Sequence, residues 1–206
     1  MNIIFDFDGT IADSFETVIG VFHELTHRDE TLPPDEIERL RGMSLLHAAE
    51  ELRVQPWKMP FLMMRGRRRM TKLIPSIATF AGLPKIIRQL YAEGHNLYIM
   101  SSNSAQNIQL FLQKSEMHTD FIKIYGNVGL FNKARVLKRI MRHNQLGLDE
   151  TFYVGDEVRD IEAAHHAGIK IVSVAWGYNN QQVLAAHKPD FLANRPVELL
   201  KIFVKQ

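Results

Sequence analysis

Short, nearly uninterrupted apolar segments are the feature that most limits how this chain can fold. Strands of an antiparallel sheet with one solvated face alternate apolar and polar residues, whereas strands buried on both faces of a parallel sheet are apolar throughout. The clearest such segments are Ile3–Phe7, Leu97–Met100, Phe152–Val154 and Ile169–Val174. Ile122–Tyr125 and Phe191–Leu192 are weaker candidates. The pattern therefore predicts a parallel sheet that is covered on both faces.

Amphipathic helices are expected between these strands from residue 83 onward. Apolar residues recur there at spacings of three and four, which is typical of helices with one face packed on a core. The predicted helices are Leu83–Glu93, Ala105–Lys114, Lys133–His143 and Asp160–Ala167. The alternation of strands and helices favours an α/β fold with a doubly wound, Rossmann-like parallel sheet.

The segment between the first strand and residue 82 has a different pattern. It shows helical periodicity and no convincing strand, and a structureless loop of that length would be improbable. The predicted helices are Phe15–His27, Asp35–Leu40, Leu45–Leu52 and Pro60–Lys72. We therefore expect a core domain made of residues 1–13 and 83–206, with residues 14–82 inserted as an α-helical cap domain.

Composition excludes several classes of function. The 206 residues include no cysteine, which removes disulfides, thiolate zinc sites, iron–sulfur clusters and a cysteine nucleophile. No apolar run approaches the roughly 18 residues of a membrane span, and the chain starts with aspartates where a signal peptide has a positive flank. The net charge of +2 is too close to neutral to indicate a nucleic acid partner. We expect a cytoplasmic protein that binds neither a membrane nor a nucleic acid.

Two aspartates stand at the end of the first predicted strand. Asp6 and Asp8 are separated by one residue, so alternation along an extended chain directs both to one side and Phe7 into the core. Two close carboxylates repel each other and therefore favour a bound cation, a shared proton, or both. Gly9 permits the tight turn with which such a strand would end.

Three further polar clusters occur beside predicted strands and helix starts. Ser101-Ser102-Asn103 offers small hydrogen-bond donors suited to phosphate oxygens, Lys133 begins a helix, and Gly155-Asp156-Glu157-Val158-Arg159-Asp160 adds carboxylates. Open α/β sheets bind ligands at the carboxyl ends of their strands, so we expect these clusters to meet there. Acids, hydroxyls and one lysine together form a site for a hard cation with room for a phosphoryl group.

In this order, the four clusters resemble the motifs of the haloacid dehalogenase superfamily. The segment Asp6-Phe7-Asp8-Gly9-Thr10 at an N-terminal strand is the most specific of them. The resemblance covers essentially the whole chain and is greatest to phosphatases of the phosphoglycolate phosphatase type, which carry a helical cap. It therefore implies the same architecture as the strand and helix pattern.

The resemblance also implies the roles of the residues that would carry the reaction. Asp6 matches the nucleophile, which attacks phosphorus and forms an aspartyl-phosphate, and Asp8 matches the general acid and base. Ser101, with Ser102 beside it, matches the position that hydrogen-bonds the transferring phosphoryl group. Lys133 matches the cation that offsets charge on the nucleophile and the phosphate.

A magnesium site is implied in the same way. Asp156 matches a Mg²⁺ ligand, and Asp6 and the carbonyl of Asp8 match the others. Asp160 matches an acid that supports the metal, either directly or through water. The family's dehalogenases lack the second acid of the first motif, so Asp8 argues against dehalogenation.

These observations favour a magnesium-dependent phosphatase that acts on a small phosphorylated metabolite. A sugar phosphomutase of the same superfamily would carry the same motifs, and a non-catalytic binding module could keep the fold without the activity. The intact acidic motifs argue against the binding module. The sequence leaves open the identity of the substrate, the cap residues that select it and the oligomeric state.

Two features outside the motifs each allow two interpretations. The basic run in the predicted cap is either a solvated helix face or a surface that steers an anionic substrate; its members are Arg65, Arg67, Arg68, Arg69 and Lys72. Trp176-Gly177-Tyr178 follows the strand predicted at Ile169–Val174, and it either lines the entrance of the site or has no part in it.

Overall fold

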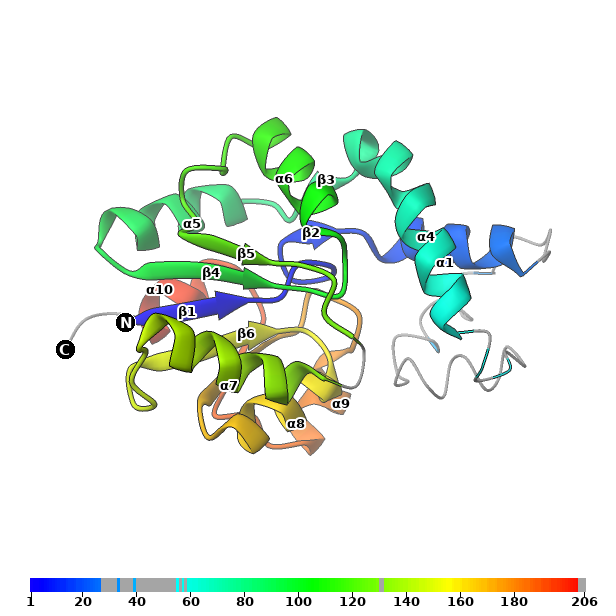
Figure 1. Ribbon diagram of the computed structural model, residues 1–206. Helices are drawn as coiled ribbons and strands as arrows, with labels where there is room; N and C mark the ends of the chain where they lie inside the picture. Colours follow the sequence, from blue (N-terminus) through cyan, green and yellow to red (C-terminus); the bar gives the residue numbers. More distant parts are fainter. Residues whose placement is uncertain are drawn as a thin grey trace.

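The computed structural model describes residues 1–26, 33, 39, 55, 57, 59–129 and 132–203. In this part of the chain, six parallel strands form the main sheet in the order β5-β4-β1-β6-β7-β8 (Figure 1). Their bounds are β1 Asn2–Phe5, β4 Asn96–Met100, β5 Lys123–Tyr125, β6 Thr151–Gly155, β7 Lys170–Val174 and β8 Phe191–Ala193. The predicted parallel sheet is confirmed.

The two weaker strand predictions correspond to the two outer strands of this sheet. β5 and β8 each pair with one neighbour and are partly exposed, whereas every residue of the inner strand β1 is buried. An edge strand has less contact with the covering helices, so its sequence carries a weaker apolar pattern. In the centre, Ile3 of β1 is in register with Leu97 of β4 and Phe152 of β6.

Helices cover both faces of the sheet. Their bounds are α5 Leu83–Ala92, α6 Ala105–Lys114, α7 Lys133–Asn144, α8 Val158–Ala167, α9 Gln181–Ala186 and α10 Glu198–Ile202. Successive residues of β1 point to opposite faces of the sheet. Ile3 and Phe5 belong to the hydrophobic cluster under α5, α6 and α10, and Ile4 belongs to the cluster under α7, α8 and α9. This arrangement confirms the predicted doubly wound α/β fold. None of the described helices combines the length and apolar character needed to cross a membrane.

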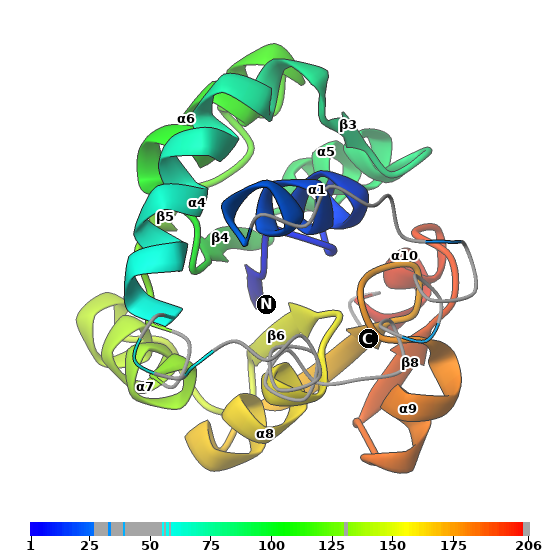
Figure 2. The same ribbon diagram turned by 90° about the vertical axis from the view of Figure 1, so that its right-hand side faces the viewer.

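Two helices from residues 14–82 lie beyond the end of the sheet toward which β1 and β4 point (Figures 1 and 2). They are α1, Phe15–Leu25, and α4, Met59–Leu73, close to the predicted bounds. The two helices pack against each other, and Gly66 of α4 faces Val21 and Leu25 of α1. Apart from Arg39, the helices predicted at residues 35–40 and 45–52 lie outside the described residues.

The chain passes from the sheet to these helices before α1 and returns after α4. A short antiparallel pair of strands connects these two segments. β2, Ala12–Asp13, pairs with β3, Ala78–Thr79. The expectation of no strand between the first strand and residue 82 was therefore wrong. Two residues are too few to show alternation, so only the pairing of Ala12 with Thr79 and of Asp13 with Ala78 identifies β3.

Candidate active site

The motif residues converge at the carboxyl ends of the central strands. Asp6 follows β1, Ser101 follows β4, Asp156 follows β6, and Lys133 begins α7. Asp6 and Lys133 are each 3% exposed, and Asp156 and Asp160 are fully buried. Charged groups are rarely buried to this degree unless they are paired or bind a metal, so this end of the sheet is the candidate active site.

Lys133 lies between two of the acids. Its Nζ donates to Asp6 Oδ2 at 2.5 Å and to Asp160 Oδ1 at 2.5 Å. Burial lowers the pKa of Lys133, but the charges of Asp160 and Asp6 outweigh this effect and raise the pKa, so the lysine stays protonated. The hydroxyl of Tyr153 also donates to Asp160 Oδ1, at 3.2 Å. The ammonium group is thus held against Asp6 in a fixed position.

Asp6, Asp156 and Asp160 form a cluster with the character of a metal site. One carboxylate oxygen of each lies within 4.8 Å of the others. Burial raises the pKa of Asp6 to about 7 despite the nearby Lys133, and burial together with Glu157 and Asp160 raises the pKa of Asp156 well above its usual value. Such shifts mean that negative charge is insufficiently compensated here, and all the donors are hard oxygens.

The charges gathered at this end of the sheet leave a negative excess. When ionised, five acids face two bases, which leaves a net charge of −3; the groups are Asp6, Asp8, Asp156, Glu157, Asp160, Lys133 and Arg159. One divalent cation would offset most of this charge. The donor set and the charge therefore both fit Mg²⁺.

Asp8 is partly buried and accepts hydrogen bonds from two sides. Ser14 Oγ donates to its Oδ1 at 2.9 Å, and Asn103 Nδ2 lies 3.1 Å from its Oδ2 and 3.3 Å from its Oδ1. Burial raises the pKa of Asp8, while the bonds from Ser14 and Asn103 oppose this shift. Phe7, between the two aspartates, is fully buried and packs edge-on against Phe111, as the alternation predicts.

Asp156 is held by the turn that follows the first motif and by the segment after β7. Thr10 Oγ1 donates to its Oδ1 at 2.6 Å, and the backbone N–H of Tyr178 donates to its Oδ2 at 2.8 Å. The indole of Trp176 donates to the carbonyl of Thr10, and the hydroxyl of Tyr178 lies 3.2 Å from Ser14 Oγ. The segment Trp176–Tyr178 therefore packs directly against the site. Of the two interpretations that the sequence left open for this segment, the one in which it has no part in the site is excluded.

Gly9 must remain glycine for this turn to approach Asp156. Its φ is +77°, and a Cβ there would lie 2.1 Å from Asp156 Oδ2. We expect Gly9→Ala to lower the free energy of unfolding by at least about 2 kcal/mol, since left-handed backbone costs about 1–2 kcal/mol before the clash is added. Gly20→Ala is the matched control, because Gly20 lies in the exposed part of α1 with open space around it.

Urea denaturation measures both variants. Gly20→Ala is expected to raise the free energy of unfolding by about 0.5–1 kcal/mol, because alanine favours a helix interior. Equal stabilities of the two variants would contradict the close approach of the first-motif turn to Asp156.

The residues after β4 differ in what surrounds them. Ser101 is buried, and its Oγ accepts from the backbone N–H of Asn103 at 3.0 Å, so its hydrogen can be donated to a ligand. Ser102 is partly buried. The sequence predicts Asn103 as a phosphate donor beside these serines, but in the structure its side-chain N–H group faces Asp8. The sequence did not show that Asn103 and Ser14 contact Asp8, that Thr10 and Tyr178 contact Asp156, or that Tyr153 contacts Asp160. Each of these contacts joins distant positions or lies in a turn that has no sequence pattern.

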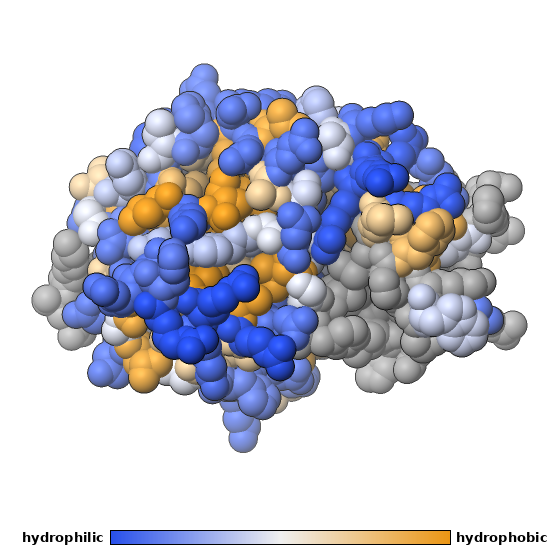
Figure 3. All heavy atoms as spheres, viewed as in Figure 1, coloured by the Kyte–Doolittle hydropathy of each residue, from blue (hydrophilic) through white to orange (hydrophobic). Residues whose placement is uncertain are grey.

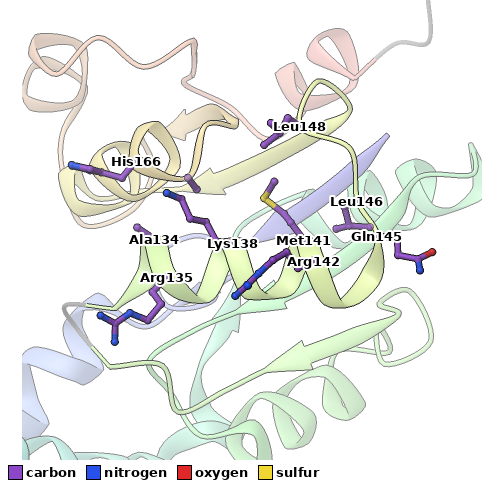
Figure 4. Close-up of a pocket in the computed structure, with 10 residues that line it drawn as sticks. Ala134, Arg135, Lys138, Met141, Arg142, Gln145, Leu146, Leu148 and His166 are labelled. Atoms are coloured by element: carbon purple, nitrogen blue, oxygen red, sulfur yellow. The ribbon is translucent and has the colours of Figure 1, made fainter.

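A hollow of about 900 Å³ lies elsewhere, between α7 and α8 (Figure 4). Exposed cations of α7 gather at this face, where Figure 3 shows an extended hydrophilic patch over α7. The residues that line the hollow are Ala134, Arg135, Lys138, Met141, Arg142, Gln145, Leu146, Leu148, His166 and Ala167. None of these ten belongs to the motifs, so the hollow is separate from the candidate active site.

A doubly wound sheet with buried carboxylates and a lysine at its carboxyl end is the arrangement of the haloacid dehalogenase-like hydrolases. The model of that family matches residues 3–174, and the chain belongs to it. The resemblance inferred from the motifs is confirmed, and the protein is an enzyme of the hydrolase class.

Individual relatives show which members of the family the chain is similar to. The chain is 34% identical over 201 residues to a phosphoglycolate phosphatase of Synechococcus elongatus, covering 97% of this chain and 95% of that protein. It is 24% identical over 197 residues to a 5'-nucleotidase of Pseudomonas aeruginosa, covering 91% and 88%. A solved haloacid dehalogenase-like hydrolase from Streptococcus pneumoniae has the same fold, with a TM-score of 0.80, 23% identity, and coverage of 98% of this chain and 97% of that one.

Proposed function

We propose that this protein is a magnesium-dependent phosphatase that hydrolyses a small phosphate monoester through an aspartyl-phosphate. The observation that carries the proposal is the contact of Lys133 Nζ with both Asp6 and Asp160, at 2.5 Å each, beside buried Asp156. A fixed cation against a carboxylate nucleophile offsets the repulsion between that nucleophile and an incoming phosphoryl group.

In the first step, a carboxylate oxygen of Asp6 attacks phosphorus. The bond from phosphorus to the leaving oxygen breaks, and its electron pair goes to that oxygen, which takes a proton from the Asp8 carboxyl. The step requires Asp8 to be protonated beforehand. Burial, which raises the pKa of Asp8, favours that state. The alcohol leaves, and Asp6 is converted to an acyl phosphate.

In the second step, Asp8 acts as a base. It removes a proton from water while the water oxygen attacks phosphorus, and the bond from phosphorus to Asp6 breaks with its electron pair returning to the carboxylate. Inorganic phosphate is released, and Asp8 is protonated again. Throughout, the hydroxyl of Ser101 is suited to donate to a phosphoryl oxygen, since it uses only a lone pair for the N–H of Asn103.

Asp6, Asp156 and the carbonyl of Asp8 are the groups that would hold Mg²⁺. When bound, the ion supplies positive charge to the phosphoryl oxygens and to the nucleophile. Asp160 is occupied differently, because its carboxylate accepts from Lys133, from the Tyr153 hydroxyl and from the backbone N–H of Glu157. We therefore assign Asp160 to holding Lys133, with support of the metal through water.

Residues 14–82 act in this proposal as the cap that encloses the substrate. α1 and α4 lie on the side of the sheet where the motifs meet, and closure there would keep bulk water from the reaction. Phosphoglycolate is the first substrate to test, because the relative at 34% identity carries that activity in its name. Nucleoside monophosphates belong in the same panel because of the nucleotidase relative.

The test is release of inorganic phosphate from a panel of phosphorylated metabolites, with Mg²⁺ and with a chelator. We expect hydrolysis of at least one aliphatic phosphate monoester, abolished by the chelator. Transfer of the phosphoryl group to a sugar instead of to water would identify a phosphomutase, and no turnover of any substrate with Mg²⁺ would overturn the proposed function.

The metal assignment has a readout that does not depend on turnover. Mg²⁺ at ten times its Kd should stabilise the fold by about 1.4 kcal/mol, which raises the melting temperature. Asp156→Ala should remove most of this gain, whereas Asp149→Ala, a change at an exposed acid, should retain it. Equal responses to Mg²⁺ in the two variants would contradict the assignment of Asp156 as a ligand.

A further inference from the structure

A chain of side-chain hydrogen bonds connects helix α4 to Asp8. Thr71 Oγ1 donates to Asn107 Oδ1 at 2.7 Å, and Asn107 Nδ2 donates to Asn103 Oδ1 at 2.9 Å. Asn103 Nδ2 then donates to Asp8 Oδ2 at 3.1 Å. Asn107 Nδ2 also donates to the carbonyl of Arg67, one helical turn before Thr71. α4, α6 and the first motif are thereby linked through two amides.

The bonds of this chain determine which way each amide faces. Asn103 Oδ1 accepts from the backbone N–H of Ser104 at 2.8 Å as well as from Asn107. A flipped Asn103 would turn its oxygen toward the Asp8 carboxylate and its NH₂ group toward two donors, which is unfavourable at every contact. Asn107 is oriented in the same way, because its oxygen faces the Thr71 hydroxyl and its NH₂ group faces two carbonyl oxygens.

Burial makes this orientation costly to lose. Asn107 is fully buried and Asn103 is 6% exposed, so neither amide can exchange its partners freely for water. An interface between two helices needs only apolar side chains for packing, whereas a buried polar chain is favourable only if all of its members are satisfied. The chain therefore specifies a geometry, and the group at its end is Asp8.

We propose that Thr71 and Asn107 are positioning residues for Asp8. They hold the Asn103 amide with its NH₂ group toward the Asp8 carboxyl, which in turn keeps that carboxyl aimed at the leaving oxygen and at water. Without the Thr71 hydroxyl, Asn107 Oδ1 loses its donor, so fewer hydrogen bonds fix the orientation of Asn107 and, through it, that of Asn103. The inference rests on the proposed function, in which Asp8 is the acid and base.

The experiment compares Thr71→Val with Thr71→Ser. Valine keeps the shape of threonine but has no hydroxyl, whereas serine keeps the hydroxyl and loses only a methyl group. Each variant is assayed with Mg²⁺ on the aliphatic phosphate that the wild type hydrolyses fastest and on 4-nitrophenyl phosphate. The aliphatic alkoxide needs protonation to leave, and 4-nitrophenolate leaves with little help, so the ratio of the two kcat/KM values measures how well Asp8 acts as an acid.

Thr71→Val is expected to lower kcat/KM about tenfold for the aliphatic ester and less than about threefold for 4-nitrophenyl phosphate, a part of the 100-fold or more that a general acid supplies. Thr71→Ser should keep the wild-type ratio of the two kcat/KM values. Asn107→Leu tests the next link and should change the ratio in the same direction, with melting temperatures checking that the variants are folded. The loss should appear in kcat more than in KM, because no substrate contact is removed.

Two patterns would overturn the inference. An equal loss for both substrates means a structural role only, and a wild-type ratio in Thr71→Val means that Asp8 does not depend on this chain. Asp8→Asn, assayed in parallel, separates failure of the inference from failure of the proposed function. If Asp8→Asn changes the ratio while Thr71→Val and Asn107→Leu do not, Thr71 and Asn107 are not positioning residues for Asp8, and the proposed phosphatase mechanism stands.

Discussion

Replacing Asp6 with asparagine is expected to lower kcat for phosphate release by at least about 10⁴-fold, the scale at which loss of a nucleophile acts. An amide cannot form the acyl phosphate, and the remaining groups act only on that intermediate or on its formation. The variant should still fold, because Lys133 keeps Asp160 as a partner and the crowded acids repel each other less.

The measurement is steady-state phosphate release by the purified variant, with Asp149→Asn as the matched change at an exposed acid. Near-UV circular dichroism establishes that both proteins are folded. If Asp6→Asn retains a tenth of wild-type activity, Asp6 is not the nucleophile, and the proposed aspartyl-phosphate mechanism is wrong.

Asp8→Asn is expected to divide the reaction into a fast first step and a slow second one when the substrate is an aryl phosphate. The phenolate leaves with little help from an acid, so the aspartyl-phosphate should still form. The second step needs a base to activate water, whatever the leaving group was. The variant should therefore release about one phenol per active site in a burst and then turn over slowly.

Rapid mixing with 4-nitrophenyl phosphate measures this burst directly. With an aliphatic ester, the same variant should show no burst, because the first step then also needs the missing acid. Steady turnover at the wild-type rate with either substrate would exclude Asp8 as acid and base.

How completely a strand is buried explains how well it could be predicted from the sequence. β1, β4, β6 and β7 are flanked on both sides in the sheet and covered on both faces, so nearly all of their positions are apolar and the pattern is unmistakable. The pattern weakens at the outer strands β5 and β8. It is absent at β3, where Ala78 and Thr79 form a strand only through pairing with β2.

The motif residues could be selected because strand order in an α/β fold brings the carboxyl ends of the strands together. Asp6, Ser101 and Asp156 each follow an apolar run, and that position in the chain is itself the signal. The contact of Lys133 with Asp6 and Asp160 needed the structure, since residues 6, 133 and 160 are related only by the packing of α7 and α8 on one sheet face.

The sequence by itself determined the fold class, the order of the six main strands with helices α5 to α8 between them, and the family, because these depend on local patterns of burial and on motifs within a few residues. Tertiary structure alone decided which donors surround each acid: Ser14 and Asn103 at Asp8, Thr10 and Tyr178 at Asp156, and the link from Thr71 through Asn107. Hydrogen bonds between distant residues leave no periodic trace in a chain, because their partners are chosen by how the helices and strands pack.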